Sequence, residues 1–280
     1  MRQRILSAMV GLVLLACVLA LIDTLFFNAV MAVISVLGVI EMLNATDTLK
    51  FKDMSALTIA LALFLPFAAE NIVWRRMPLF SFFWMILFFI LLIKNFGKVN
   101  VEQAAVVFMT SILVPLCFAS AVYLGKGNGA IARFYLLWAL GSAWLCDSGA
   151  YFCGSAFGKH KLAPQISPKK TVEGSVGGTI VSVVFMLGIT IAYEAVAMSV
   201  FGVRMEINYT AIACLTPVFA VLGMLGDLTA SVIKRQYGVK DYGHIMPGHG
   251  GIMDRFDSVL FTLPAVYILV QQYPVATVVR

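Results

Sequence analysis

The sequence predicts an all-α integral membrane protein, a polytopic bundle of about nine transmembrane helices. Of its 280 residues, 61% are hydrophobic and only 12% are charged, which is more apolar surface than a soluble domain of this size can bury. Several uninterrupted apolar stretches approach the roughly 20 residues that cross about 30 Å of hydrocarbon. They are too many for one cleaved signal sequence, so we expect the first stretch, 5–22, to be retained.

The apolar runs and the polar breaks between them place the spans along the chain. We expect helices near 5–22, 25–43, 56–69, 79–93, 104–123, 134–157, 176–197, 211–228 and 258–272. The run 56–69 is short and contains Pro66, so it fits a short, kinked or re-entrant element. The helix count therefore lies between about eight and ten.

The basic residues indicate the orientation of the spans. When the loops are assigned alternately to two sides, one side receives only six of the 20 lysines and arginines. These six are Arg75, Arg76, Lys126, Arg133, Arg204 and Arg280. By the positive-inside rule, the N-terminus and both long polar loops are cytoplasmic, in a multi-pass protein of the plasma membrane.

Charge and cysteine usage exclude other classes. The net charge is +6, but the basic residues are scattered through short loops without solvent-facing aromatics between them, so we expect no nucleic-acid binding. The five cysteines lie mostly in apolar segments without CxxC spacing, which indicates reduced packing residues and no structural zinc.

The two parts of the chain differ in character. Residues 1–133 contain apolar helices with short ordinary loops, typical of a scaffold, whereas 134–280 combines helices with polar loops that we expect to be cytosolic and catalytic. Glu41, Glu70 and Glu194 lie near helix ends where water has access, so we assign them no function.

The most informative segment begins at Asp227, at the end of an apolar run that continues as a helix to Arg235. Helical spacing places Asp227, Ser231, Lys234 and Arg235 on one face. An ionisable group beside a membrane span costs a few kcal/mol unless it is paired, hydrated or bound to an ion, so it indicates function. The alternative for the two basic residues is an interfacial anchor of the helix end.

A charged, glycine-rich run follows before the last apolar segment, at 240–257. Glycines around His249 let the backbone approach an anion and aim N–H groups at phosphate oxygens. Aspartates paired with lysines and arginines suit a Mg²⁺-nucleotide, because hard cations prefer oxygen ligands.

A second polar cluster covers 147–174. Asp147 lies inside an apolar run with Tyr151 one turn later, which favours a site role over a buried structural hydrogen bond. The small residues Ala150, Gly154 and Gly158 indicate close helix packing. The lysine-rich loop 159–170 either anchors the orientation or, as its prolines and glycines indicate, is shaped to grip phosphates.

Both clusters resemble known motifs of the phosphatidate cytidylyltransferases, also called CDP-diacylglycerol synthases. The residues similar to the C-terminal signature of that family are Ser231, Val232, Ile233, Lys234, Arg235, Lys240, Asp241, Gly243, Pro247, His249, Gly250, Gly251, Asp254, Arg255 and Asp257. The segment 147–174 resembles the other common block, including its Ser-Pro-x-Lys-Thr-x-Glu-Gly element. Met246 and Val172 depart from the usual residues but remain apolar.

This resemblance implies transfer of a cytidylyl group from CTP to phosphatidic acid among membrane lipids, giving CDP-diacylglycerol and pyrophosphate. It implies Mg²⁺ as cofactor, allows a second cation such as K⁺, and is compatible with a homodimer. The implied metal ligands are Asp227, Asp254 and Asp257. The implied catalytic residues are Asp227, Asp254, Lys234 and Arg235. The implied substrate-binding residues are Asp147, Lys159, Lys169, Lys170, Glu173, Ser231, Lys240, Asp241, His249, Gly250, Gly251 and Arg255.

Two alternatives stay open. Another CTP-using lipid enzyme, such as a polyprenol kinase or an archaeal-type CDP-lipid synthase, would share the substrate chemistry. A transporter or channel would use Asp147, Asp227 and Asp254 as an ion path, although such a path does not require the glycine and lysine motifs.

Overall fold

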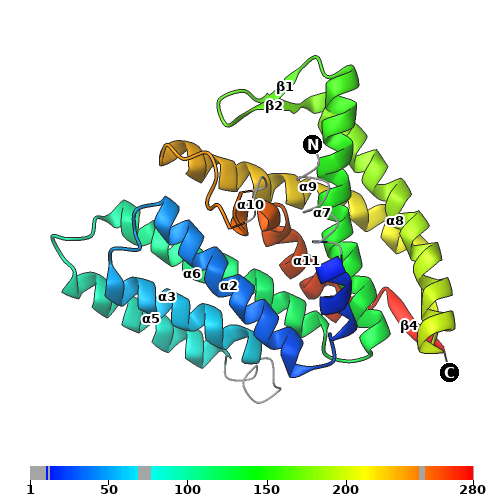
Figure 1. The fold of residues 1–280 in the computed structure, drawn as a ribbon, viewed down its shortest axis with the longest axis horizontal. Coiled ribbons are helices and arrows are strands. Elements are labelled where there is room, and N and C mark those ends of the chain that lie inside the picture. The colour runs from blue at the N-terminus through cyan, green and yellow to red at the C-terminus, as the bar shows by residue number, and fades with distance from the viewer. Residues whose placement is uncertain (1–10, 12, 69–76, 246–249, 280) are drawn as a thin grey trace. The chain divides into compact units, whose positions relative to one another are not determined.

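The structure is a computed structural model that describes residue 11 and the ranges 13–68, 77–245 and 250–279. Helices make up most of it, together with two short antiparallel pairs of strands (Figure 1). The first expected span, 5–22, is described only at residue 11 and from 13 onward, where it is helical to 20, and each later span corresponds to a helix. The chain forms two compact units, Met1–Tyr123 with Gln236–Arg255, and Leu124–Arg235 with Phe256–Arg280.

The first unit is helical. Its elements are α2 (Leu25–Ala45), α3 (Lys52–Phe64), the 3-10 turn η1 (Leu65–Phe67), α5 (Met77–Lys94) and α6 (Val101–Leu124). Pro66 lies in η1, where it ends α3 because its nitrogen cannot donate to the helix, so the expected short element is confirmed. A reciprocal pair of hydrogen bonds between Asn100 and Gln103 caps the start of α6.

The second unit combines long helices with two strand pairs. Its elements are α7 (Gly129–Phe157), β1 (Lys161–Ala163), β2 (Ser167–Thr171), α8 (Val172–Phe201), β3 (Arg204–Ile207), α9 (Tyr209–Gln236), α11 (Val259–Gln272) and β4 (Ala276–Val279). Trp138 is fully buried at its centre, where the indole N–H donates to Thr216 and the ring meets Phe219 edge-on at 4.9 Å. α9 is continuous to Gln236, which confirms the expected extension beyond Asp227.

Glycines allow α7 and α8 to pack closely. A Cβ added to Gly178 would lie 2.5 Å from the carbonyl oxygen of Cys146, and one on Gly149 would lie 2.8 Å from Val181. Gly154 and Gly158 similarly leave room for Thr171. The interpretation of the small-residue stripe as a packing feature is therefore confirmed.

The strands depart from the expected all-α fold. β1 pairs with β2 in a hairpin between α7 and α8 (Figure 1). β3 pairs with β4 so that Arg204 faces Val279 and Ile207 faces Ala276. The strands are short, and the partners of the second pair lie about 70 residues apart, so local periodicity carries little signal for them.

The described helices support a membrane location. Five of them, α2, α6, α7, α8 and α9, are long and apolar enough to cross a bilayer, and α5 and α11 are shorter apolar helices. The outward side chains of α8 include Ile180, Val184, Phe185 and Ile191, all largely exposed. Such a surface suits contact with lipid.

Candidate active site

The polar face of α9 forms one wall of the site in the second unit. The Ser231 hydroxyl lies 3.4 Å from Oδ1 of Asp227, as the helical spacing predicted, and Lys170 of β2 pairs with the other carboxylate oxygen. The side chains of Lys170 and Asp227 are only 20% and 22% exposed. Solvent screens such a partly buried pair less than a surface pair, so the two charges attract each other more strongly. A buried carboxylate without a cationic partner would be destabilising.

Asp257, at the start of α11, brings a second carboxylate to the same place. Gly226 has no room for a Cβ because the backbone of Asp257 lies against it, so the residues flanking Asp227 and Asp257 touch. Nζ of Lys234 lies 3.8 Å from Oδ2 of Asp257, and both side chains are 11% exposed. The Asp257 Oδ1 accepts the N–H of Ser258 at 2.9 Å.

The neighbouring charges and the burial of Asp257 shift the pKa of its carboxyl group. Burial first, and the negative charge of Asp227 second, raise the pKa of the Asp257 carboxyl to about 7, against the opposing effect of Lys234. Asp147 of α7 adds a smaller effect of the same sign as Asp227. The second unit therefore brings together three carboxylates and two lysines, namely Asp147, Asp227, Asp257, Lys170 and Lys234. The sequence predicted each of these residues but not their grouping.

The β1–β2 hairpin carries the remaining lysines of this group. The Glu173 carboxylate accepts the backbone N–H groups of Lys159 at 3.0 Å and His160 at 3.2 Å, and it also meets the His160 ring at 2.5 Å. The Arg235 Nε donates to the carbonyl of Ile166 in the hairpin turn at 3.2 Å. Lys159 and Lys169 are exposed, so they remain available to a ligand.

The glycine-rich loop belongs to the first unit and wraps around Asp254 of α10 (Met253–Phe256). Oδ2 of Asp254 accepts the N–H of Tyr242 at 2.8 Å and that of Gly251 at 3.0 Å. Gly250 has a φ of 84°, and a Cβ there would lie 2.9 Å from the same oxygen. The predicted metal ligand Asp254 thus also shapes the loop.

Glu41 of α2 was missed by sequence reasoning. Its side chain is 6% exposed, so the expectation of a water-accessible position is wrong. Its Oε2 accepts the N–H of Met253 at 2.9 Å, and a Cβ on Gly243 or Gly251 would collide with its carboxylate. The rule that marked Asp147, an acid inside an apolar run, would have marked Glu41 as well.

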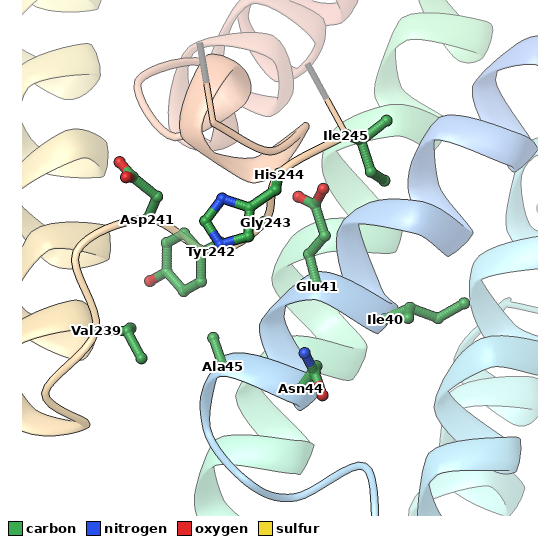
Figure 2. A pocket seen from close by; sticks show the side chains of 10 residues that line it. All are labelled: Ile40, Glu41, Asn44, Ala45, Val239, Asp241, Tyr242, Gly243, His244 and Ile245. Atoms are coloured by element: carbon green, nitrogen blue, oxygen red, sulfur yellow. The ribbon is translucent and has the colours of Figure 1, made fainter. Parts of the chain in front are cut away.

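A cavity of about 400 Å³ opens beside this contact, between α2 and the loop 239–245. Figure 2 shows the Glu41 side chain directed from α2 towards the loop at Gly243, with Asp241 and His244 on the loop side. Asp241, a predicted substrate-binding residue, is exposed at its edge, and Lys240 of the loop and Arg255 of α10 are also exposed. The predicted residue His249 lies outside the described part of the chain.

The donor chemistry fits Mg²⁺ bound together with phosphates. Among the residues that the structure describes, no group of three or more His, Cys, Asp or Glu side chains forms a ready-made metal site. Mg²⁺ is usually held by one or two carboxylates and by substrate phosphates, so an all-protein cage is not required. Asp227 and Asp257 provide two such carboxylates in one unit.

Comparison with known proteins places the chain in a class. It matches the model of the Cytidylyltransferase family over residues 2–273, and it belongs to this family. A phosphatidate cytidylyltransferase of Bacillus subtilis (strain 168) is 36% identical over 203 residues, which cover 72% of this chain and 70% of that protein. A phosphatidate cytidylyltransferase of Staphylococcus aureus (strain COL) is 32% identical over 286 residues, covering 97% of this chain and 100% of that protein.

Proposed function

We propose that this chain transfers CMP from CTP to phosphatidic acid, giving CDP-diacylglycerol and pyrophosphate. The observation that carries the proposal is the lysine-paired carboxylate cluster of Asp227 and Asp257 in a chain of this family. A phosphatidate oxygen attacks the α-phosphorus of CTP in line, a P–O bond forms, and the bond to the β-phosphate oxygen breaks. Pyrophosphate leaves with the electron pair, without a covalent enzyme intermediate.

The proposed chemistry depends on bringing two polyanions together. Mg²⁺ offsets phosphate charge when bound, and a second cation such as K⁺ can share this role. Asp227 and Asp257 would hold the metal in the second unit, and Asp254 is the metal ligand that we propose in the first unit. Lys234 and Arg235 hold phosphates near the reacting atoms, and alignment supplies much of the rate acceleration.

The loops supply the other substrate contacts in this proposal. Asp147, the hairpin lysines, Glu173 and Ser231 surround the nucleotide or lipid headgroup from the second unit. Within the first unit, the residues that we propose as phosphate contacts are Lys240, Asp241, His249, Gly250, Gly251 and Arg255. Residues 1–133 act mainly as scaffold and 134–280 carry the reactive groups.

The membrane setting follows from the substrates. The lipid keeps its acyl chains in the bilayer, whereas CTP arrives from water, so helix ends beside polar loops are the place where they can meet. We place the protein in the plasma membrane with about nine spans, with the N-terminus and catalytic loops cytoplasmic. A homodimer is compatible with this arrangement.

The experiment uses purified protein with Mg²⁺, phosphatidic acid and CTP labelled in either the α- or the γ-phosphate. Label in the lipid from the α-phosphate alone, with no product from ATP, is the expected result. Lipid label from the γ-phosphate, or labelling of a prenol in place of phosphatidic acid, would identify kinase chemistry or another lipid substrate instead. Ion flux in proteoliposomes without nucleotide would favour a transporter.

A further inference from the structure

An open apolar groove of about 550 Å³ runs along the second unit where α7 ends and α8 begins. The apolar residues that line it include Cys153, Phe157, Val176, Gly177, Ile180 and Val181. Gly177 lies so close to α7 that a Cβ would come within 2.5 Å of the Cβ of Cys153. The groove is therefore a fixed feature of close helix packing, and its volume is in the range of small-molecule sites.

The hairpin that leads into this groove along the chain carries several lysines. Glu173 also lines the groove, and its carboxylate accepts the backbone N–H groups of Lys159 and His160, so its oxygens are already engaged by the hairpin. Lys159, Lys161 and Lys169 of the same hairpin are exposed. An apolar groove that adjoins a lysine-bearing hairpin complements an amphiphile with an acyl chain and an anionic head.

The chain connects this groove directly to the carboxylate cluster. Lys170 pairs with Asp227, and the next residue, Thr171, accepts the N–H of Gly174 at 3.1 Å to cap α8. Val172 and Glu173 then line the groove. A ligand whose chain lies in the groove would thus present its head beside the hairpin that carries Lys170.

We propose that the groove seats an acyl chain of the phosphatidate substrate while the exposed hairpin lysines hold its phosphomonoester. This assignment rests on the proposed function. It commits to the substrate lipid and not to bulk membrane phospholipid, because the lysine-rich end favours a headgroup with more negative charge than a zwitterionic one.

Cys153 gives a direct readout of occupancy. The protein has five free cysteines, of which Cys17 and Cys214 are exposed and Cys117 and Cys146 are buried. In a variant with Cys17→Ser and Cys214→Ser, we expect phosphatidic acid in phosphatidylcholine vesicles to slow maleimide labelling of Cys153 several-fold. In a matched variant with Cys17→Ser and Cys153→Ser, labelling of Cys214 should not change.

Equal labelling of Cys153 with and without phosphatidic acid would overturn the assignment. Equal protection by phosphatidylglycerol or phosphatidylserine would also overturn it, because the groove would then bind membrane lipid generally. Neither result depends on catalysis, so each is distinguishable from failure of the proposed function, which would appear as absent product from the unmodified protein at saturating substrates.

Groove-filling substitutions provide a kinetic test. Val176→Trp should raise the KM for phosphatidic acid about tenfold, in keeping with the effect of steric misfit in an apolar pocket, and leave the KM for CTP unchanged. Val184→Trp is the control, since Val184 lies on the same helix outside the groove lining with 60% exposure, against 57% for Val176. Equal KM values for phosphatidic acid in the two variants would contradict the assignment.

Discussion

The two units hold their carboxylates with different donors. In the first unit, Glu41 and Asp254 accept backbone N–H groups of the glycine-rich loop. In the second, Asp227 and Asp257 are paired with the ammonium groups of Lys170 and Lys234. Backbone donors fix a shape and cannot leave without unfolding the loop, whereas an ammonium group on a flexible stem can move aside for a metal ion or a phosphate. We therefore call Glu41 and Asp254 with their backbone donors the rigid site, and Asp227 and Asp257 with their lysines the exchangeable site.

The largest expected effect is on activity at the exchangeable site. Asp227→Asn should reduce CDP-diacylglycerol formation by more than about a hundredfold, because even the outer partners of a metal are worth about 10–100-fold. Its melting temperature should also fall, because Lys170 loses its charge partner even though Asn can still accept from Ser231. Asp254→Ala should lose activity and also melt earlier, because two backbone N–H groups lose their acceptor. Near-normal turnover in both variants would refute the metal assignment.

The rigid site should respond to added volume. Gly251→Ala forces a methyl group against the Glu41 carboxylate and should cost about 1–3 kcal/mol of stability, measured by denaturation in detergent. Combining it with Glu41→Ala should cost less than the sum of the two single changes, because the collision is removed. Gly188→Ala is the control, since nothing lies within 4 Å of a Cβ at that position. Simple additivity would show that the two residues do not interact.

The exchangeable site should couple metal binding to protons. Burial and the negative charge of Asp227 raise the pKa of the Asp257 carboxyl, so more of it carries a proton at pH 6 than at pH 8. Since Mg²⁺ binds the carboxylate form, the Mg²⁺ concentration for half-maximal thermal stabilisation with CTP should be about tenfold higher at pH 6 than at pH 8. Asp257→Asn should retain only the pH dependence of CTP itself. The same dependence in both proteins would exclude Asp257.

The smallest effect is expected at the exposed edge of the hairpin. Lys169→Ala removes a solvated charge, so the KM for phosphatidic acid should rise by no more than about fivefold. Lys170→Ala, which leaves Asp227 without its partner, should have a larger effect, mainly on kcat. A reversed order would show that the exposed lysine, and not the partly buried one, supports the reaction.

Most of the helices could be predicted from the sequence, because an apolar run that is long enough to span a membrane is recognised without knowledge of its neighbours in the fold. The α9 face was predictable for a similar reason, since Asp227, Ser231 and Lys234 are related by one local period. The Glu41 contact was not predictable as a pair, because Met253 lies 212 residues further along the chain. The glycines were expected to approach an anion, and in the described loop Gly243 and Gly251 approach the protein's own carboxylate. Their role towards phosphates stays a prediction.

The return of the chain to its first unit has a consequence for biogenesis. Glu41 is synthesised long before Met253, so during translation its Oε2 lacks the backbone donor that it later accepts from. Helices α7, α8 and α9 of the second unit emerge from the ribosome in that interval. The first unit to begin is therefore among the last to be completed, and a chain that is interrupted within α9 still lacks the backbone donor to the Glu41 carboxylate.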